Sequence, residues 1–271
     1  MYSEYQPCHL LSAYVDKYWE FKGKPLRGTR INILPDGCTD FIFTLGEVAQ
    51  VAGERSLLMQ PYRSFFVGPM NRYSELVVCT GSVHMLGIRF LPCGLLRFMN
   101  LPLDELGNQR VHTVDLKTIF DSFSVEKLCA LLHIRDRIEW IEKYLINALK
   151  QPDLTDRQIT LAVNQINHSR GKQTVRALME DICICQRHFE RKFKLHTGFS
   201  PKEYSRIVKF RNALDLLRNT SSGNLLTVAV AAGYYDVAHL CKEIKTLSGS
   251  TASSFSALDL PEDLTLTYTE R

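Results

Sequence analysis

The first ninety residues alternate between short apolar runs and turn residues, which is typical of β-strands. Runs rich in β-branched and aromatic residues lie at 30–34, 40–45, 64–67, 74–79 and 83–90. The break at Pro35, Asp36 and Gly37 is a turn signal, because glycine accepts the positive φ of a tight turn. Short strands at this close spacing predict an antiparallel β-barrel or sandwich rather than a parallel sheet.

After Pro92 the hydrophobic period changes from that of strands to that of helices. Apolar spacings of three and four predict helices at 125–132 and 137–149, and the helical period continues from there to about residue 258. The break at Gln151, Pro152 and Asp153 indicates a linker. The sequence therefore predicts an α+β chain, with a β-barrel and trailing helices in residues 1–150, an all-α domain in residues 151–258 and a loose acidic tail in residues 259–271.

The helical half contains an internal repeat with a period of 51 residues. Shifting the chain by this period places Phe189 on Leu240 and Phe193 on Ile244, so an apolar i, i+4 pair recurs. Residues 174–181 and 225–232, just upstream, also correspond as short helices. Each copy predicts a helix-turn-helix unit, the first at about 174–196 and the second at about 225–247.

The ends of the second helices correspond as well. Gly198 and Gly249 fall where the glycine of a left-handed C-cap belongs, and Cys185 and Asp236 take the N-cap position. Aspartate suits an N-cap and cysteine does not.

Between the two copies, residues 200–217 predict one continuous amphipathic helix. Ser200 suits the N-cap, Pro201 the first helical position, and Glu203 completes a capping box. At 1.5 Å per residue the helix is roughly 27 Å long, which is close to one duplex turn. We therefore expect it to hold two recognition helices against successive major-groove segments on one face of DNA.

The second helix of the first copy carries a polar stripe opposite its phenylalanines. Arginine pairs with guanine and glutamate accepts from the cytosine amine in the major groove. Arg187, Glu190 and Arg191 are therefore predicted base contacts. The matching stripe of the second copy is less polar, and its lysines suit phosphates. The predicted phosphate or secondary contacts are Gln186, Lys194, His239, Cys241, Lys242 and Lys245.

The distribution of charge agrees with this interpretation. The formal net charge of the whole chain is only +4. Residues 1–150 hold 17 basic and 16 acidic side chains, whereas residues 170–218 hold 12 basic and 5 acidic ones. The positive charge is therefore concentrated around the first predicted recognition helix, where a phosphate backbone would be met.

Composition excludes several other classes of protein. With 45% hydrophobic and 23% charged residues, wholesale disorder and fibrous repeats are excluded. There is no apolar run long enough to cross a membrane and no export leader, so we expect no membrane partner and a cytoplasmic location. The eight cysteines include one C-x-C pair without a second pair nearby, which predicts reduced thiols, no metal site and no cofactor.

The helical half resembles the DNA-binding domain of the AraC family of bacterial transcription regulators. The resemblance spans residues 159–255 and rests on the stretches that begin at Cys185, His196, Phe210 and Val228. It implies seven helices with two helix-turn-helix units joined by a long helix. The chain departs from the family pattern at Cys185, Ala252 and Ile244, and at Val237 and Ala238, which replace a more polar pair.

The N-terminal half is similar to the cupin-like β-barrel domains attached to many such regulators. The residues that carry this likeness are the stretches beginning at Leu34 and Leu86. The resemblance implies a domain that binds a small effector, mediates dimerisation, or does both. Arg89, on an alternating strand, is the candidate effector-binding residue, since it could meet an anion inside a barrel.

No catalytic motif occurs in the chain. His84 has no second histidine two or four residues away, and the phosphate-loop, dinucleotide and nucleophile-elbow patterns are absent. The first hypothesis is therefore a non-enzymatic, sequence-specific DNA-binding transcription regulator, with double-stranded DNA, a small effector, RNA polymerase and a second copy of the chain as partners. The alternative is a small-molecule-binding β-barrel protein whose helical half is a protein-interaction module.

Overall fold

The computed structural model describes residues 2–26, 30–46, 49–52, 58–78, 82–116, 118–151, 154–180, 182, 185–219, 224–256 and 266–269. The predicted linker residues Pro152 and Asp153 lie outside the described residues, as do Cys79 and Cys183. All the predicted DNA-contacting residues and Arg89 lie within them.

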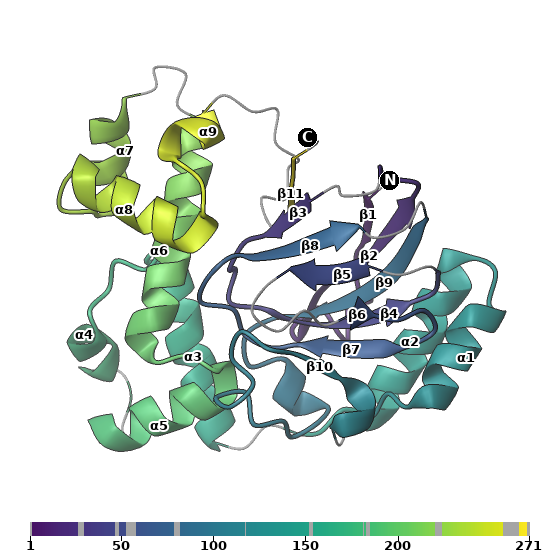
Figure 1. The fold of residues 1–271 in the computed structure, drawn as a ribbon. Helices are drawn as coiled ribbons and strands as arrows, with labels where there is room; N and C mark the ends of the chain where they lie inside the picture. The colour runs from purple at the N-terminus through teal and green to yellow at the C-terminus, as the bar shows by residue number, and fades with distance from the viewer. Residues whose placement is uncertain are drawn as a thin grey trace.

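The N-terminal half is built from two antiparallel sheets (Figure 1). The first has six strands in the order β1 (Tyr2–Tyr5), β2 (Val15–Gly23), β9 (Val83–Phe90), β4 (Thr39–Thr44), β7 (Ser64–Val67) and β10 (Arg110–His112). The second has five in the order β11 (Leu266–Thr269), β3 (Arg30–Ile33), β8 (Ser74–Val78), β5 (Ala49–Ala52) and β6 (Leu58–Met59). The described pairings are all antiparallel, as the sequence predicts.

The central strands β9, β4 and β7 of the six-stranded sheet are buried on both faces. Successive side chains of a strand point to opposite sides, and each side of this sheet is covered by another layer. In β4, Phe41 and Phe43 join the layer beneath helices α1 (Ser122–Ala130) and α2 (Ile134–Ala148). Ile42, between them, faces the second sheet in a layer with Ile31 and Leu76. Two short 3-10 helices, η1 (Leu95–Arg97) and η2 (Thr113–Asp115), complete the connections.

The helical half contains seven described helices, the number that the AraC resemblance implies. They are α3 (Leu154–His168), α4 (Val175–Glu180), α5 (Gln186–Thr197), α6 (Pro201–Asn219), α7 (Leu225–Ala232), α8 (Val237–Ser248) and α9 (Ala252–Ser256). In Figure 1, α6 runs between a group formed by α3, α4 and α5 and a group formed by α7, α8 and α9. No helix among the described residues is both long and apolar enough to cross a membrane.

The predicted turn at Asp36 and Gly37 connects strands of different sheets. β3 pairs with β8 and β4 pairs with β7 and β9, so the turn carries the chain from one sheet to the other. Gly37 has φ +85°, and a Cβ there would lie 2.6 Å from the Tyr204 ring on α6. Glycine is therefore required both by the backbone conformation and by the helix that packs against it.

The expectation of a loose C-terminal tail is corrected in part. Leu266–Thr269 form β11, which pairs antiparallel with the edge strand β3. The Leu-Thr-Tyr-Thr sequence has high β-propensity, and an edge strand offers unpaired backbone groups to it. The other residues of the predicted tail lie outside the described part of the chain.

The two halves contact each other next to the first helix-turn-helix unit. Arg97 Nη1 in η1 lies 3.2 Å from Asp156 Oδ2 on α3, and His196 Nε2 on α5 lies 2.8 Å from Asp156 Oδ1. Pro69 of the sheet half packs against Gly198, the residue that ends α5. A recognition helix is therefore joined to the N-terminal half by an ion pair and by packing.

Candidate nucleic-acid interface

The first helix-turn-helix unit consists of α4 and α5, and α5 is its second helix. Phe189 and Phe193 of α5 are fully buried and their rings meet edge to face at 5.5 Å. Burying this i, i+4 pair orients the helix, because the residues between the pair must then point outward. The predicted apolar face of α5 is confirmed.

The outer face of α5 carries the predicted base-contacting residues. Arg187, Glu190 and Arg191 are all exposed, and Lys194 continues the stripe toward the helix end. Gln186 Nε2 donates to Glu190 Oε1 at 2.8 Å, and Arg191 Nη2 lies 3.4 Å from His188 Nδ1. These contacts orient the polar groups along one helix face while leaving them accessible.

The second unit consists of α7 and α8, with the turn at Gly233, whose φ is +80°. Leu240 and Ile244 of α8 are fully buried, as their partners in the first unit are. The predicted phosphate-contacting residues His239, Lys242 and Lys245 are exposed.

Two of the predicted secondary contacts of α8 are partly engaged by the protein itself. Lys245 Nζ donates to the carbonyl oxygen of Gly249 at 2.6 Å, which places its charge at the C-terminal end of the helix. Cys241 is only half-exposed, because its side chain packs against the core of the unit. The polar surface of α8 is therefore smaller than that of α5.

The ends of the two second helices match as the repeat predicts. Gly198 has φ +79° and Gly249 has φ +73°, so each closes its helix in the left-handed conformation. Asp236 caps α8 by accepting from the His239 backbone N–H at 2.7 Å. Cys185, at the corresponding place, makes no side-chain cap of α5.

Helix α6 holds the two units together. Its predicted capping box is present: Ser200 Oγ accepts from the Glu203 backbone N–H, and Glu203 Oε2 accepts from the Ser200 backbone N–H. Toward the second unit, Arg206 Nη2 lies 3.1 Å from Glu243 Oε1 on α8, and this hydrogen bonding raises the pKa of Arg206. The 19 residues of α6 span about 28 Å.

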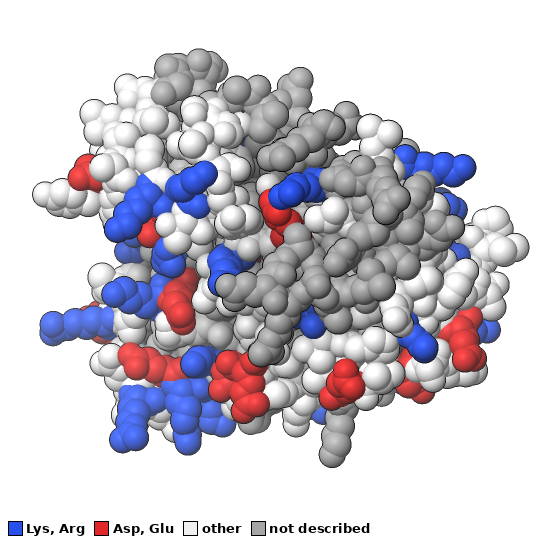
Figure 2. All heavy atoms as spheres, viewed as in Figure 1, with Lys and Arg blue, Asp and Glu red and all other residues white. Residues whose placement is uncertain are grey.

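Basic side chains gather over the helical half. Figure 2 shows Lys and Arg at the lower left, where α5 lies in Figure 1, and again near α8, with acidic side chains between them. The positive charge that the segment counts assign to the helical half thus lies on the surface near α5 and α8.

The predicted effector-binding residue Arg89 is paired inside the protein. Its side chain is 6% exposed, with Nη1 3.1 Å from Asp36 Oδ2 and Nε 3.2 Å from Asp40 Oδ1. Burial raises the pKa of the Asp40 carboxyl, and the Arg89 charge and a hydrogen bond from Trp19 act in the opposite direction. Two carboxylates face this guanidinium, so the geometry does not favour an anion there.

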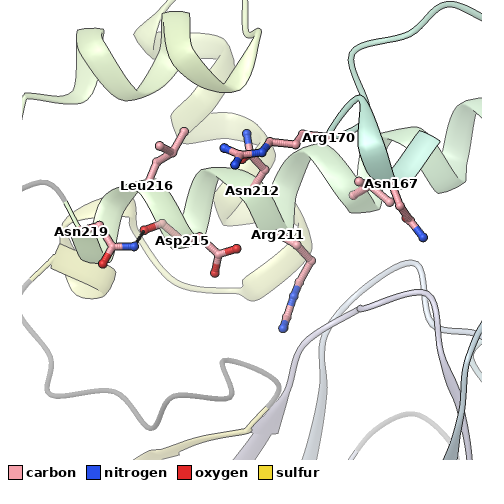
Figure 3. Close-up of a pocket in the computed structure, with 8 residues that line it drawn as sticks. Asn167, Arg170, Arg211, Asn212, Asp215, Leu216 and Asn219 are labelled. Carbon is pink, nitrogen blue, oxygen red and sulfur yellow. Dashed lines mark hydrogen bonds between the residues drawn. The ribbon is translucent and has the colours of Figure 1, made fainter. Parts of the chain in front are cut away.

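Sequence reasoning missed a polar cleft of about 340 Å³ on α6 (Figure 3). Arg170, in the turn after α3, donates from Nη1 to Asn212 Oδ1 at 3.2 Å, and Arg211, Asp215 and Asn219 continue along α6. The i, i+4 spacing of Arg211, Asp215 and Asn219 could have indicated this polar face of α6, because residues four apart are neighbours on a helix.

Sequence reasoning also missed Tyr235, in the turn between α7 and α8. Its side chain is 92% exposed, whereas the neighbouring Tyr234 is only 6% exposed. The place of Tyr235 directly before the N-cap Asp236 could have indicated a surface position, because that turn leads into the second helix of the unit. Tyr235 therefore belongs to the outer surface of the second unit.

Two family models match the chain. A helix-turn-helix domain model matches residues 178–257, and a domain of unknown function (DUF6597) matches residues 3–112. An uncharacterized HTH-type transcriptional regulator of Haemophilus influenzae is 27% identical over 146 residues, which are 53% of this chain and 47% of that protein. The matched part spans about half the length of that relative.

Solved structures of ToxT from Vibrio cholerae share the fold of both halves. One covers 89% of this chain and 99% of the ToxT chain at 8% identity, with a TM-score of 0.51. Another, with (E)-4-(8-methylnaphthalen-1-yl)but-3-enoic acid bound, covers 88% and 98% at 7% identity, with a TM-score of 0.50. At these identities the likeness concerns the fold.

The fold and the exposed faces of α5 and α8 define the class as a two-domain helix-turn-helix protein. Within that class, residues 178–257 are a helix-turn-helix domain of the AraC type, as the sequence resemblance implies.

Proposed function

We propose that this chain is a bacterial transcription regulator that binds specific DNA sequences through both helix-turn-helix units. One observation carries the proposal: two matching units, each with a buried apolar pair and an exposed basic face on its second helix, are fixed to one continuous helix. At about 28 Å, α6 suits recognition helices that enter successive major-groove segments.

Base reading by the first unit belongs to Arg187, Glu190 and Arg191. All three are exposed on the face of α5 opposite its buried phenylalanines. Arginine donates two hydrogen bonds to guanine, and a carboxylate accepts from the cytosine amine, so this face favours G·C pairs.

Phosphate contacts belong to the cationic side chains around that face and on the second unit. These contacts position the protein without specifying sequence, and each one adds to the salt dependence of binding. The residues in this role are Lys194, His239, Lys242 and Lys245, with Gln186 and Cys241 as secondary contacts.

The N-terminal half serves, in this proposal, as an effector-binding and dimerisation domain. Between the two sheets lies a cavity of about 40 Å³, lined mainly by apolar side chains such as Trp19, Ile42 and Leu76. Small-molecule sites usually have several hundred Å³, so an effector there requires the sheets to move apart. The ion pair at Asp156 and the packing on Gly198 would carry such a movement to α5.

A regulator of this kind acts where the bacterial chromosome lies, so we place it in the cytoplasm. Its further partners in this proposal are RNA polymerase and a second copy of the chain. No catalytic step is part of the proposed function.

The proposal is tested by selecting bound fragments from a random DNA pool and titrating the enriched sequence at fixed salt. Replacing Arg191 with Ala should weaken specific binding by about 1–3 kcal/mol and relax sequence preference at one position. Arg135→Ala, which removes an exposed arginine on α2, is the matched control and should leave the affinity unchanged. Unchanged affinity in Arg191→Ala would refute the assignment of that residue.

The alternative function, a β-barrel protein with a helical protein-interaction module, gives a different result. Such a protein would elute from a DNA column at low salt and enrich no sequence. A steep fall in affinity with rising salt supports the regulator instead.

A further inference from the structure

The two recognition helices present different chemistry at equivalent positions. The period of 51 residues places Ala238 where the first unit has Arg187, and Cys241 where it has Glu190. The matching left-handed caps at Gly198 and Gly249, and the matching buried pairs, show that the two helices are oriented alike. Ala238 is exposed as Arg187 is, and Cys241 is half-exposed where Glu190 is exposed. The second unit thus replaces two hydrogen-bonding side chains with small apolar ones.

The surface at the start of α8 is apolar as well as small. Ala238 is exposed in the first turn of the helix, and Tyr235, just before the N-cap Asp236, is 92% exposed. Within the described part of the chain, the Tyr235 side chain has no hydrogen bond or ring contact, so the structure of the free protein gives no reason for an aromatic residue there.

The N-terminal residues of a recognition helix are the ones that meet base edges in the major groove. In that groove the thymine 5-methyl is the apolar group presented by a base pair, and alanine and aromatic side chains contact it. A short residue such as Ala238 also lets the helix approach the bases closely.

We propose that the second unit reads thymine, through contact of Ala238 and Tyr235 with 5-methyl groups in the major groove. This inference rests on the proposed function, and it assigns base-reading to a unit whose lysines suit phosphates. The two units then read different base pairs, since α5 contacts hydrogen-bonding edges of G·C pairs and the start of α8 contacts methyl groups of A·T pairs.

The experiment replaces each thymine of the selected DNA site in turn with deoxyuridine, which removes only the 5-methyl group. Affinity is measured at fixed salt for the wild-type protein and for Tyr235→Ser and Ala238→Ser. Each methyl group in contact should be worth about fourfold in affinity, since a buried carbon of that size contributes roughly this factor. At a contacted thymine, the deoxyuridine effect should disappear in one of the two variants, because Tyr235→Ser removes the aromatic ring and Ala238→Ser puts a polar hydroxyl group on the carbon that would face the methyl group.

Two further variants separate the inference from general damage. Arg187→Ala should weaken binding and leave the deoxyuridine effects in place, because it acts through the first unit. Leu132→Ser removes a side chain that is 84% exposed in the N-terminal half and should change nothing. Far-UV circular dichroism confirms that each variant is folded.

Deoxyuridine effects that are absent, or that persist unchanged in both Tyr235→Ser and Ala238→Ser, overturn the inference while leaving the DNA-binding function intact. If the wild-type protein selects no DNA sequence at all, the proposed function itself is wrong and the inference fails with it.

Discussion

Replacing Asp156 with Ala should destabilise the protein strongly, because this carboxylate joins the two halves. It lies between Arg97 and His196, whose side chains are each 7% exposed, while its own is 26% exposed. Arg97 Nε and Nη2 are buried without a hydrogen-bond partner among the described residues, so the variant would leave a buried cation without its carboxylate. Removing one partner of a buried ion pair costs about 3–5 kcal/mol, and partial exposure places this case near 3 kcal/mol.

The free energy of unfolding is measured by urea titration, followed by far-UV circular dichroism. Glu139→Ala is the control, because Glu139 and Lys143 form a comparable pair at 2.7 Å whose side chains are 65% and 71% exposed. Surface pairs of this kind contribute little, so the control should unfold like the wild type. If Asp156→Ala unfolds at the same urea concentration as Glu139→Ala, the structural role given to Asp156 is refuted.

Other substitutions test the repeat and the core by the same titration. Asp236→Ala removes the N-cap of α8 and should lower the free energy of unfolding by about 1 kcal/mol. Cys185→Asp adds an N-cap to α5 and should raise it by up to about 1 kcal/mol. Equal effects of the two substitutions would contradict the cap assignment. Phe193→Ala should cost about 3–5 kcal/mol, and a loss below 1 kcal/mol would show that this ring is not in the core. Burial lowers the pKa of His84 from its usual 6.5, so the free energy of unfolding should fall as pH drops below 6.5. His84→Gln should remove that part of the pH dependence. An unchanged dependence of the free energy of unfolding on pH in this variant would contradict the role given to His84.

The helical half is the part that the sequence predicts best. Helices such as α5 and α8 have one buried stripe each, so spacings such as Phe189 with Phe193 report the period directly, and α7 and the start of α8 lie where the repeat places them. The exposure of Arg187 and Arg191 follows from the same spacing. These features are local, and local patterns are what periodicity measures.

The sheets were harder to predict than the helices, although the buried strands β4, β7 and β9 lie where the apolar runs indicate. β2 was not among the predicted strands: Tyr18 and Trp19, adjacent in sequence, are both buried, one toward the helices and one toward the second sheet. This adjacent pair interrupts the alternation of polar and apolar residues that marks a strand. β11 was missed because its partner β3 lies more than 230 residues earlier in the chain.

The surroundings of Arg89 could not be predicted for a related reason. Arg89 occupies an inward position of its strand, but its carboxylate partners Asp36 and Asp40 lie about 50 residues away in sequence. No local pattern shows that the three meet. Tyr235 was not predicted because it lies in the turn before α8 and is not part of the polar stripe of that helix.

The central claim is that the two units bind successive major-groove segments at a spacing fixed by α6. It is tested most directly by inserting about five base pairs between the two elements of a selected DNA site, which turns one element roughly half a helical turn away from the other. Binding by the wild-type protein should weaken at least tenfold, and inserting about ten base pairs should not restore it, because α6 cannot lengthen. Equal affinity for the parent site and the site with five added base pairs would show that α6 does not fix the spacing of the two units on DNA.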